Sequence, residues 1–293
     1  MATIHEVRRA FCLSRAQLFG VRDGVTAAIE ARLVGRESSL ALLPSFLRRP
    51  AGLPSGTYLA LDFGGSNIRA ARIELAAGRL CVQRQVKRPL VDPAGRYDYR
   101  QCVTTTELFA FVAAVVSEAA GETGGLLGHT FSFPADQTDV NTACLRQWTK
   151  EMAVAGAEGK NVQQLLAAAL GAIGRHDIEP VALINDTVAT LLAGAQREPA
   201  TVVGTICGTG HNSCYEEAAL PRPMIVNAES GNFDGAPANC FDEALDRQSQ
   251  FPGRQRLEKM TSGQYLGELV RLAAGEAGVA LPDDWRAASL ATA

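Results

Sequence analysis

The sequence predicts an α/β protein. Apolar segments of strand length alternate along most of the chain with segments whose apolar residues recur at helical spacing. The chain has 293 residues, of which 47% are hydrophobic, so it can bury a substantial core as two domains or as one large α/β unit.

The expected helices carry an apolar stripe at intervals of three or four positions, or a start signal. Thr104 and Glu107 have the spacing of a capping box, which predicts a helix that begins there. Near the end of the chain, Leu266, Leu269, Val270 and Ala273 share one helical face. The expected helices are residues 14–33, 104–120, 161–174, 241–248 and 263–278.

The expected strands are apolar runs bounded by glycine, proline or polar residues. Residues 48–56 contain two prolines and two glycines, which is typical of a linker ahead of the first long strand. A short Ala-Ala-Gly segment between two of the strands indicates a hairpin. The expected strands are residues 57–65, 68–75, 79–86, 125–134, 180–185 and 223–230, with a strand, glycine turn and strand over 201–217.

Charge, cysteine pattern and hydropathy argue against a nucleic-acid-binding, disulfide-rich, zinc-binding or membrane-spanning protein. The net charge is −3, and no basic run is long enough to indicate a nucleic-acid partner. The seven cysteines are scattered and contain no C-x-x-C pair, so we expect reduced thiols rather than disulfides or a zinc site. No segment resembles a signal peptide or a membrane span. We therefore expect a cytoplasmic protein without a membrane segment; the oligomeric state is open.

Asp186 stands at the junction of an expected strand, "VALIN", and an expected helix, "DTVATLLAGA". Two interpretations compete. A carboxylate at this position can cap the helix. It can also accept a proton from a substrate hydroxyl, as a general base does.

A glycine-containing turn, "LDFGGSNIR", follows the first long strand. Gly64 and Gly65 allow close approach of the backbone to a ligand, and consecutive backbone N–H groups in such a turn bind anions. Ser66 and Asn67 add donors, and Asp62 is a candidate magnesium ligand, directly or through water. A plain hairpin turn explains this segment equally well when it is taken alone.

Further polar residues form islands along the chain, most of them at strand ends. Their hydroxyl, amide, carboxylate and ammonium groups suit a ligand rich in hydroxyls and phosphates. Taken alone, each of these residues is more often an ordinary exposed polar residue than part of a site, and Glu258 alone would be a solvated charge on a helix. The islands are Ser132 in "TFSFPADQ", Thr149 and Lys150 in "RQWTKEM", Asn185 beside Asp186, Thr209 and Asn212 in "GTGHN", Glu229 in "VNAESGNF" and Glu258 in "GRQRLEKM".

Taken in order, these islands resemble the hexokinases, the sugar kinases that include glucokinase. "LDFGGSNIR" is similar to that family's phosphate-binding L-D-x-G-G-T-N-x-R, and "TFSFPADQ" to its sugar-binding F-S-F-P. "WTK", "NDTVAT", "GTGHN", "VNAESGNF" and "PGRQRLEKMTSGQYLGELVRL" follow at similar intervals. The resemblance covers about residues 40–271. Seven ordered motifs are far more specific than one glycine turn.

The resemblance implies a fold with two α/β domains of the actin-like, ribonuclease-H-like class, in which sugar and ATP meet in the cleft between them. Residues 1–56 would be an N-terminal helical segment on the large domain plus the linker, 57–186 the small domain, and 187–293 the first part of the large domain. The implied function is ATP-dependent phosphorylation of a hexose, glucose, at its 6-hydroxyl, the first step of glycolysis.

The resemblance also implies residue roles, with ATP and Mg²⁺ as partners of the sugar. Asp186 corresponds to the catalytic base, and Lys150 would stabilise charge on the transferred phosphoryl group. The implied sugar-binding residues are Ser132, Phe133, Thr149, Lys150, Asn185, Asp186, Asn212, Glu229 and Glu258. The implied nucleotide-binding residues are Asp62, Gly64, Gly65, Ser66, Asn67 and Thr209, with Asp62 near the magnesium ion.

Two departures bear on these expectations. Ser230 stands where the family usually has Trp, which removes bulk beside Glu229. The sequence also stops before the family's glycine-rich "G-S-G" segment that holds adenosine, so the large domain is expected to be incomplete. Besides the kinase, a catalytically weak or silent hexose-binding or regulatory protein, or a gene fragment, therefore stays open.

Overall fold

The computed structural model describes residues 2–50, 52, 54–149 and 152–282. These residues form two compact units. Unit 1 contains the described residues of Met1–Leu43, Glu198–Tyr215 and Val226–Ala293, and unit 2 contains those of Pro44–Arg197 and Glu216–Ile225. The expected boundary between residues 186 and 187 lies within helix α5 (Asp186–Arg197), and the division into functional domains stays a prediction.

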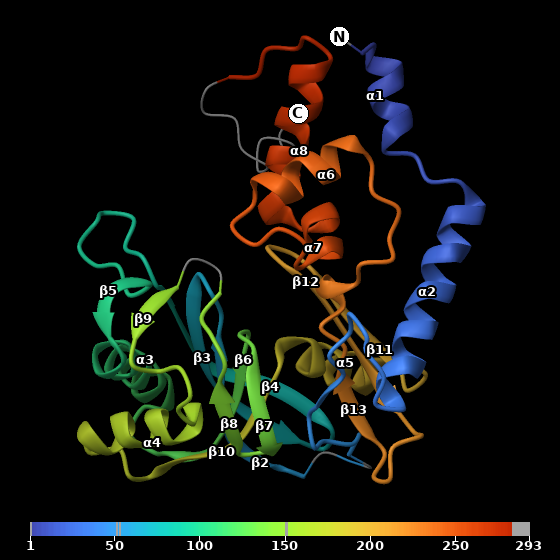
Figure 1. The fold of residues 1–293 in the computed structure, drawn as a ribbon. Coiled ribbons are helices and arrows are strands. Elements are labelled where there is room, and N and C mark those ends of the chain that lie inside the picture. Colours follow the sequence, from blue (N-terminus) through green and yellow to red (C-terminus); the bar gives the residue numbers. More distant parts are fainter. Residues whose placement is uncertain (1, 51, 53, 150–151, 283–293) are drawn as a thin grey trace. The chain divides into compact units, whose positions relative to one another are not determined.

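Unit 2 is built on a five-stranded mixed sheet in the order β10-β6-β2-β3-β4 (Figure 1). β2 pairs antiparallel with β3 and β3 with β4, whereas β2, β6 and β10 run parallel. The strands are β2 (Gly56–Phe63), β3 (Asn67–Ala76), β4 (Arg79–Pro89), β6 (Gly125–Phe131) and β10 (Ile178–Ile184). All five expected strands of this region are confirmed, and so is the hairpin, which turns at residues 77 and 78.

Helix α3 (Thr105–Ala120) packs on this sheet together with α4 (Val162–Ala172). The expected capping box is confirmed: the Thr104 hydroxyl accepts the Glu107 amide at 3.3 Å, and the Glu107 carboxylate accepts the Thr104 amide at 2.7 Å. Such a cap satisfies two N–H groups that the helix itself leaves unpaired. Short elements that were not expected complete the unit: β5 (Gln101–Thr104) with β9 (Ala153–Ala155), and β7 (Ala135–Asp139) with β8 (Thr142–Leu145).

His129 is a buried titratable group in the core of unit 2. It is 1% exposed and lies 6.2 Å from the Phe63 ring, stacked on it. Gln163 donates through Nε2 to Asn141, so its Oε1 faces His129 Nδ1 at 3.0 Å and favours the neutral tautomer with the proton on Nδ1. Among the described residues, His129 Nε2 has no hydrogen-bond partner. Burial lowers the pKa of His129 from 6.5 to about 4.

This burial predicts a loss of stability in acid. Because the folded pKa lies below the unfolded one, the stabilising difference is fully present above about pH 6.5 and is lost as the pH falls towards about 4. The loss for this one group is about 3 kcal/mol in the free energy of unfolding. Urea unfolding at several pH values should show it. His129→Gln, which keeps a neutral polar group, should flatten the curve over this range, and an unchanged pH dependence in that variant would contradict the assignment.

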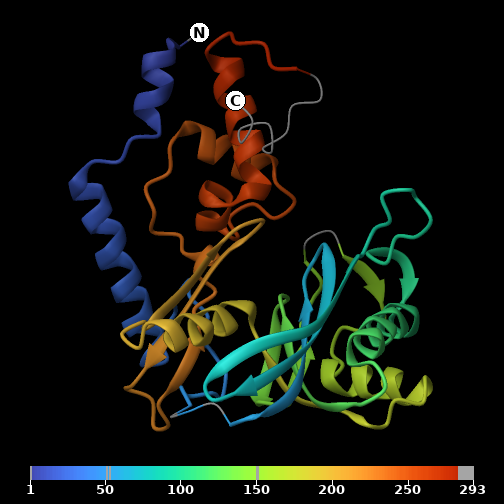
Figure 2. The same cartoon turned by 180° about the vertical axis from the view of Figure 1, so that it is seen from behind.

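Unit 1 combines the N-terminal helices α1 (Ile4–Ala10) and α2 (Arg15–Leu33) with the later helices α6 (Cys240–Gln248), α7 (Arg256–Thr261) and α8 (Gly263–Glu276). β11 (Val203–Cys207) and β12 (His211–Glu217) form the expected hairpin around the glycine turn. They belong to a four-stranded sheet in the order β1-β13-β12-β11, with β1 (Leu43–Pro44) and β13 (Met224–Asn227); residues 44, 216–217 and 224–225 of these strands are assigned to unit 2. Figure 2 shows the same elements from behind.

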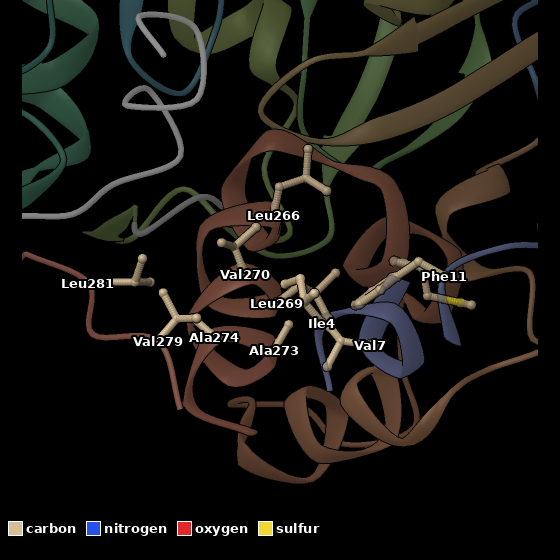
Figure 3. Close-up of a pocket in the computed structure, with 11 residues that line it drawn as sticks. Ile4, Val7, Phe11, Leu266, Leu269, Val270, Ala273, Ala274, Val279 and Leu281 are labelled. Carbon is tan, nitrogen blue, oxygen red and sulfur yellow. The ribbon is translucent and has the colours of Figure 1, made fainter. Parts of the chain in front are cut away.

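The expected apolar face of α8 lines a pocket with residues of the N-terminal segment. Figure 3 shows Ile4, Val7 and Phe11 opposite the aliphatic side chains of α8. Phe11 also stacks on Phe241 of α6, with ring centroids 5.4 Å apart. The apolar stripe expected on α2 is not buried: no residue of that helix is buried in the described structure.

Candidate functional site

Three strands of unit 2 end at one edge of the sheet, and the candidate residues follow them there. β2, β6 and β10 run parallel, so their carboxyl ends lie together. Asp62 lies near the end of β2, Ser132 follows β6, and Asp186 follows β10. Polar groups of the glycine turn and the candidate base are thus gathered at the same edge, which is where α/β sheets commonly bind ligands.

The Asp186 carboxylate is held on both sides. Ser132 Oγ donates to its Oδ2 at 2.7 Å, and the Thr187 amide donates to its Oδ1 at 3.0 Å. Its orientation is therefore fixed by α5 and by the segment after β6. A carboxylate held in this way can accept a proton from a hydroxyl placed within hydrogen-bond reach.

Asn185, rather than Asp186 alone, caps helix α5. Its Oδ1 accepts the Thr187 amide at 2.9 Å and the Thr187 hydroxyl at 2.6 Å. No described residue accepts a hydrogen bond from Asn185 Nδ2, so that amide group can donate to a ligand. Because the Asn185 side chain already caps the helix, capping alone does not explain why a carboxylate stands at residue 186.

The remaining expected sugar-binding residues of unit 2 differ in position. The Phe133 side chain is 3% exposed and packs edge-on against Trp148 at 4.9 Å, so it is a core residue and only its backbone can contact a ligand. Thr149, which follows Trp148 in the sequence, is half-buried. Lys150 lies outside the described residues.

The glycine turn joins β2 to β3. The Gly64 amide donates to the Asn67 carbonyl at 3.2 Å, which closes the turn. The Leu90 amide donates to the Ser66 carbonyl at 2.9 Å, which joins the turn to the segment after β4. Gly64 does not lie in the left-handed region, and a Cβ on it would come no closer than 3.4 Å to the atoms around it. The turn itself therefore does not require glycine at this position, which weakens the plain hairpin explanation and favours close approach of a ligand.

Asp62 is engaged by the protein at both carboxylate oxygens. Arg69 Nη1 donates to Oδ2 at 2.7 Å, and the Thr130 hydroxyl donates to Oδ1 at 3.1 Å. The described residues contain no group of three or more His, Cys, Asp and Glu side chains that could hold a metal ion. Magnesium usually keeps several waters and takes only one or two carboxylates from the protein, so a single carboxylate such as Asp62 is compatible with this ion.

Unit 1 carries the second set of candidate residues. Asn212 Nδ2 donates to Asn227 Oδ1 at 2.8 Å, and Asn227 Nδ2 donates to Glu229 Oε1 at 2.7 Å. Glu229 adopts a left-handed backbone conformation, φ 52° and ψ 47°. That conformation is costly for a residue other than glycine and is often found at binding sites. The sequence analysis did not name Asn227 as a candidate residue. Its position at the end of an expected strand, two residues before Glu229, could have indicated it.

Glu258 is held in a niche beside the start of β12. Its Oε2 accepts the His211 amide at 2.8 Å. A Cβ on Gly210 would lie 2.6 Å from that oxygen, so glycine at this position leaves room for the carboxylate as it stands; a Cβ on Gly231 would lie 2.7 Å from the His211 carbonyl oxygen and 3.1 Å from Glu258 Cβ. Thr209, in the same turn, is exposed, and its carbonyl accepts the Gln264 amide at 3.2 Å.

Comparison with known proteins extends this picture. Two family models, each described as hexokinase, match residues 3–196 and 202–278. Hexokinase-1 of Oryza sativa subsp. japonica is 38% identical over 92% of this chain, and Hexokinase-1 of Saccharomyces cerevisiae is 34% identical over 93%. The matched parts are 58% and 60% of those proteins, so the chain spans less than two thirds of their length.

Solved structures match over most of the chain. One, titled a crystal structure of hexokinase, has a TM-score of 0.80 and 36% identity and covers 96% of this chain and 68% of that one. A second, hexokinase from Schistosoma mansoni complexed with glucose, has a TM-score of 0.77 and 31% identity with the same coverage of both chains. None of the described helices is both long and apolar enough to cross a membrane.

Proposed function

Because this chain belongs to the hexokinase family, we propose that it carries the sugar site and phosphate-binding turn of an enzyme that transfers the γ-phosphoryl group of ATP to the 6-hydroxyl of glucose. The observation that carries the proposal is the Asp186 carboxylate, held by Ser132 and Thr187 at the edge of the sheet that also bears the glycine turn. The glucose-bound Schistosoma mansoni relative supports the choice of sugar.

Asp186 is the proposed general base. A sugar hydroxyl is a poor nucleophile until its proton can leave. As the 6-oxygen forms a bond to the γ-phosphorus, the bond from that phosphorus to the bridging oxygen of ATP breaks, ADP leaves, and Asp186 takes the hydroxyl proton. The contacts from Ser132 and Thr187 keep the carboxylate in one orientation, so little reorganisation is needed during transfer.

In unit 1, the proposed sugar contacts are side chains held in place by hydrogen bonds. Asn212, Asn227 and Glu229 form one hydrogen-bonded group, and Glu258 is fixed by the His211 amide. Carboxylates and amides suit sugar hydroxyls, because each hydroxyl both donates and accepts. In unit 2, the proposed sugar contacts are Asn185, Ser132 and Thr149, and Lys150 would stabilise the negative charge of the transferred phosphoryl group.

The proposed phosphate contacts are the backbone and side chains of residues 64–67 and Thr209. Backbone N–H groups in such a turn favour anions. Asp62 would hold a magnesium ion, directly or through water, and the ion would supply positive charge that neutralises the ATP phosphates. Loss of activity in EDTA and its return with magnesium would support this part of the proposal.

Gly65→Val tests the phosphate-binding turn. We expect phosphorylation of glucose, followed in a coupled assay of glucose 6-phosphate, to fall by at least about tenfold, since a branched side chain keeps the backbone away from the phosphates. Gly128→Val is the matched control, because a Cβ on this strand residue of the same unit meets no atom within 4 Å. Parent-like activity in Gly65→Val, or full activity in EDTA, would contradict this assignment.

A further inference from the structure

Beside Glu258, unit 1 contains a buried ion pair that the proposed chemistry does not use. Lys259 of α7 is 3% exposed. Its Nζ donates to Asp246 Oδ1 of α6 at 2.6 Å and to the Phe251 carbonyl at 2.7 Å. Figure 1 shows α6 and α7 as neighbours, joined by a short segment.

Asp246 also binds the segment that leads into α7. The Gly253 amide donates to its Oδ2 at 2.9 Å and to its Oδ1 at 3.1 Å. Arg256, the first residue of α7, donates to Asp246 Oδ2 at 3.4 Å and also pairs with Glu243. The Asp246 carboxylate thus binds the segment before α7, the first residue of α7 and a residue in the middle of that helix.

Helix α7 needs such support. It has six residues, too few for a helix that is stable without tertiary contacts. Its N-cap, Gln255, lies in the left-handed region with φ 53° and ψ 42°, and its side chain makes no capping hydrogen bond. That conformation costs free energy in a residue other than glycine, so the surrounding contacts must hold it.

Glu258 depends on where α7 lies. It directly precedes Lys259, and consecutive residues of a helix point about 100° apart, so one helix presents the two side chains in different directions. Lys259 reaches α6, whereas Glu258 reaches the His211 amide and fits against Gly210 and Gly231. A shift of α7 by a fraction of an ångström would therefore break the fit of the carboxylate in its niche.

Stability alone does not account for a buried ion pair. Desolvation of two charges offsets most of their attraction, and apolar replacements of similar size are often as stable. We propose that the Asp246–Lys259 pair is a positioning device that fixes α7 and thereby holds the Glu258 carboxylate in its niche. This inference rests on the proposed sugar site, in which Glu258 binds glucose.

Lys259→Met tests the inference by two readouts. We expect the glucose affinity, measured by calorimetry, to fall about tenfold or more, because a supporting residue sets the geometry of the contact. Independently of sugar, hydrogen exchange of the His211 amide, which donates to Glu258, should accelerate while the amides of β11 keep their protection. Asp246→Asn with Lys259→Met removes both charges; it should regain most of the folding stability of the parent and still bind glucose weakly.

Arg271→Met is the matched control, because it removes a cation from an exposed pair with Glu268 on α8. It should leave both readouts unchanged. Parent-like glucose affinity and His211 exchange in Lys259→Met would overturn the inference, and so would faster exchange throughout unit 1, which marks an ordinary stability role. If the parent chain binds no glucose, the proposed sugar site fails, and His211 exchange by itself then decides whether the pair positions Glu258.

Discussion

Asp186→Asn is expected to lower the rate of phosphoryl transfer from ATP to glucose by about 100-fold to 10,000-fold, the usual contribution of a general base. The amide keeps the size of the side chain, and its oxygen can still accept the Thr187 amide. The Ser132 hydroxyl can reverse its role and accept from the new NH₂ group. Glucose affinity should therefore stay within a few-fold of the parent value, so that the rate constant and not binding reports the change.

Asp136→Asn is the control for this substitution. It makes the same chemical change in unit 2, at an exposed carboxylate that pairs with Arg146 on the surface. Exposed pairs contribute little, so both activity and stability should stay close to the parent. Equal rates in Asp186→Asn and the parent would remove Asp186 as the base.

Glu229→Gln and Glu258→Gln are each expected to weaken glucose binding by about 1–3 kcal/mol, roughly 5-fold to 150-fold in the dissociation constant. Each substitution replaces a charged acceptor by a neutral amide. In Glu258→Gln the amide oxygen can still accept the His211 amide, so the niche is kept while the charge is lost. Calorimetric titration with glucose measures the effect.

Glu30→Gln provides the control for these two variants, since Glu30 is exposed on α2. Its glucose affinity should equal that of the parent. Unchanged affinity in both Glu229→Gln and Glu258→Gln would remove these carboxylates from the sugar site.

Most of the fold could be predicted because long elements carry strong periodic signals. The capping box at Thr104 and the hairpin at residues 77 and 78 are confirmed, and the solved hexokinase structures confirm the expected actin-like α/β fold over most of the chain. α1 and α7 were not delimited, since seven and six residues span too few turns to show a period. β5 and β9 are shorter still, with four and three residues, and only tertiary pairing defines them.

The candidate residues could be named from the sequence, whereas their contacts could not, and their roles stay predictions. The motifs identified the region around Asp186, yet only the structure shows that Asn185 caps α5 and that Ser132 holds the carboxylate. Phe133 stays a predicted sugar contact, but such a contact would use its backbone, because the ring follows a buried strand and packs into the core. The contact between Asp246 and Lys259 joins residues 13 positions apart on two helices, and no local pattern marks it.

The proposed function requires that these residues direct the γ-phosphoryl group of ATP to glucose. Phosphorus-31 NMR of the chain incubated with glucose, ATP and magnesium tests it most directly, because the spectrum shows where the phosphoryl group goes. We expect glucose 6-phosphate and ADP in equal amounts, with the glucose 6-phosphate signal greatly reduced for Asp186→Asn. Release of inorganic phosphate without sugar phosphate, or glucose binding without any turnover, would contradict it and favour a silent hexose-binding protein.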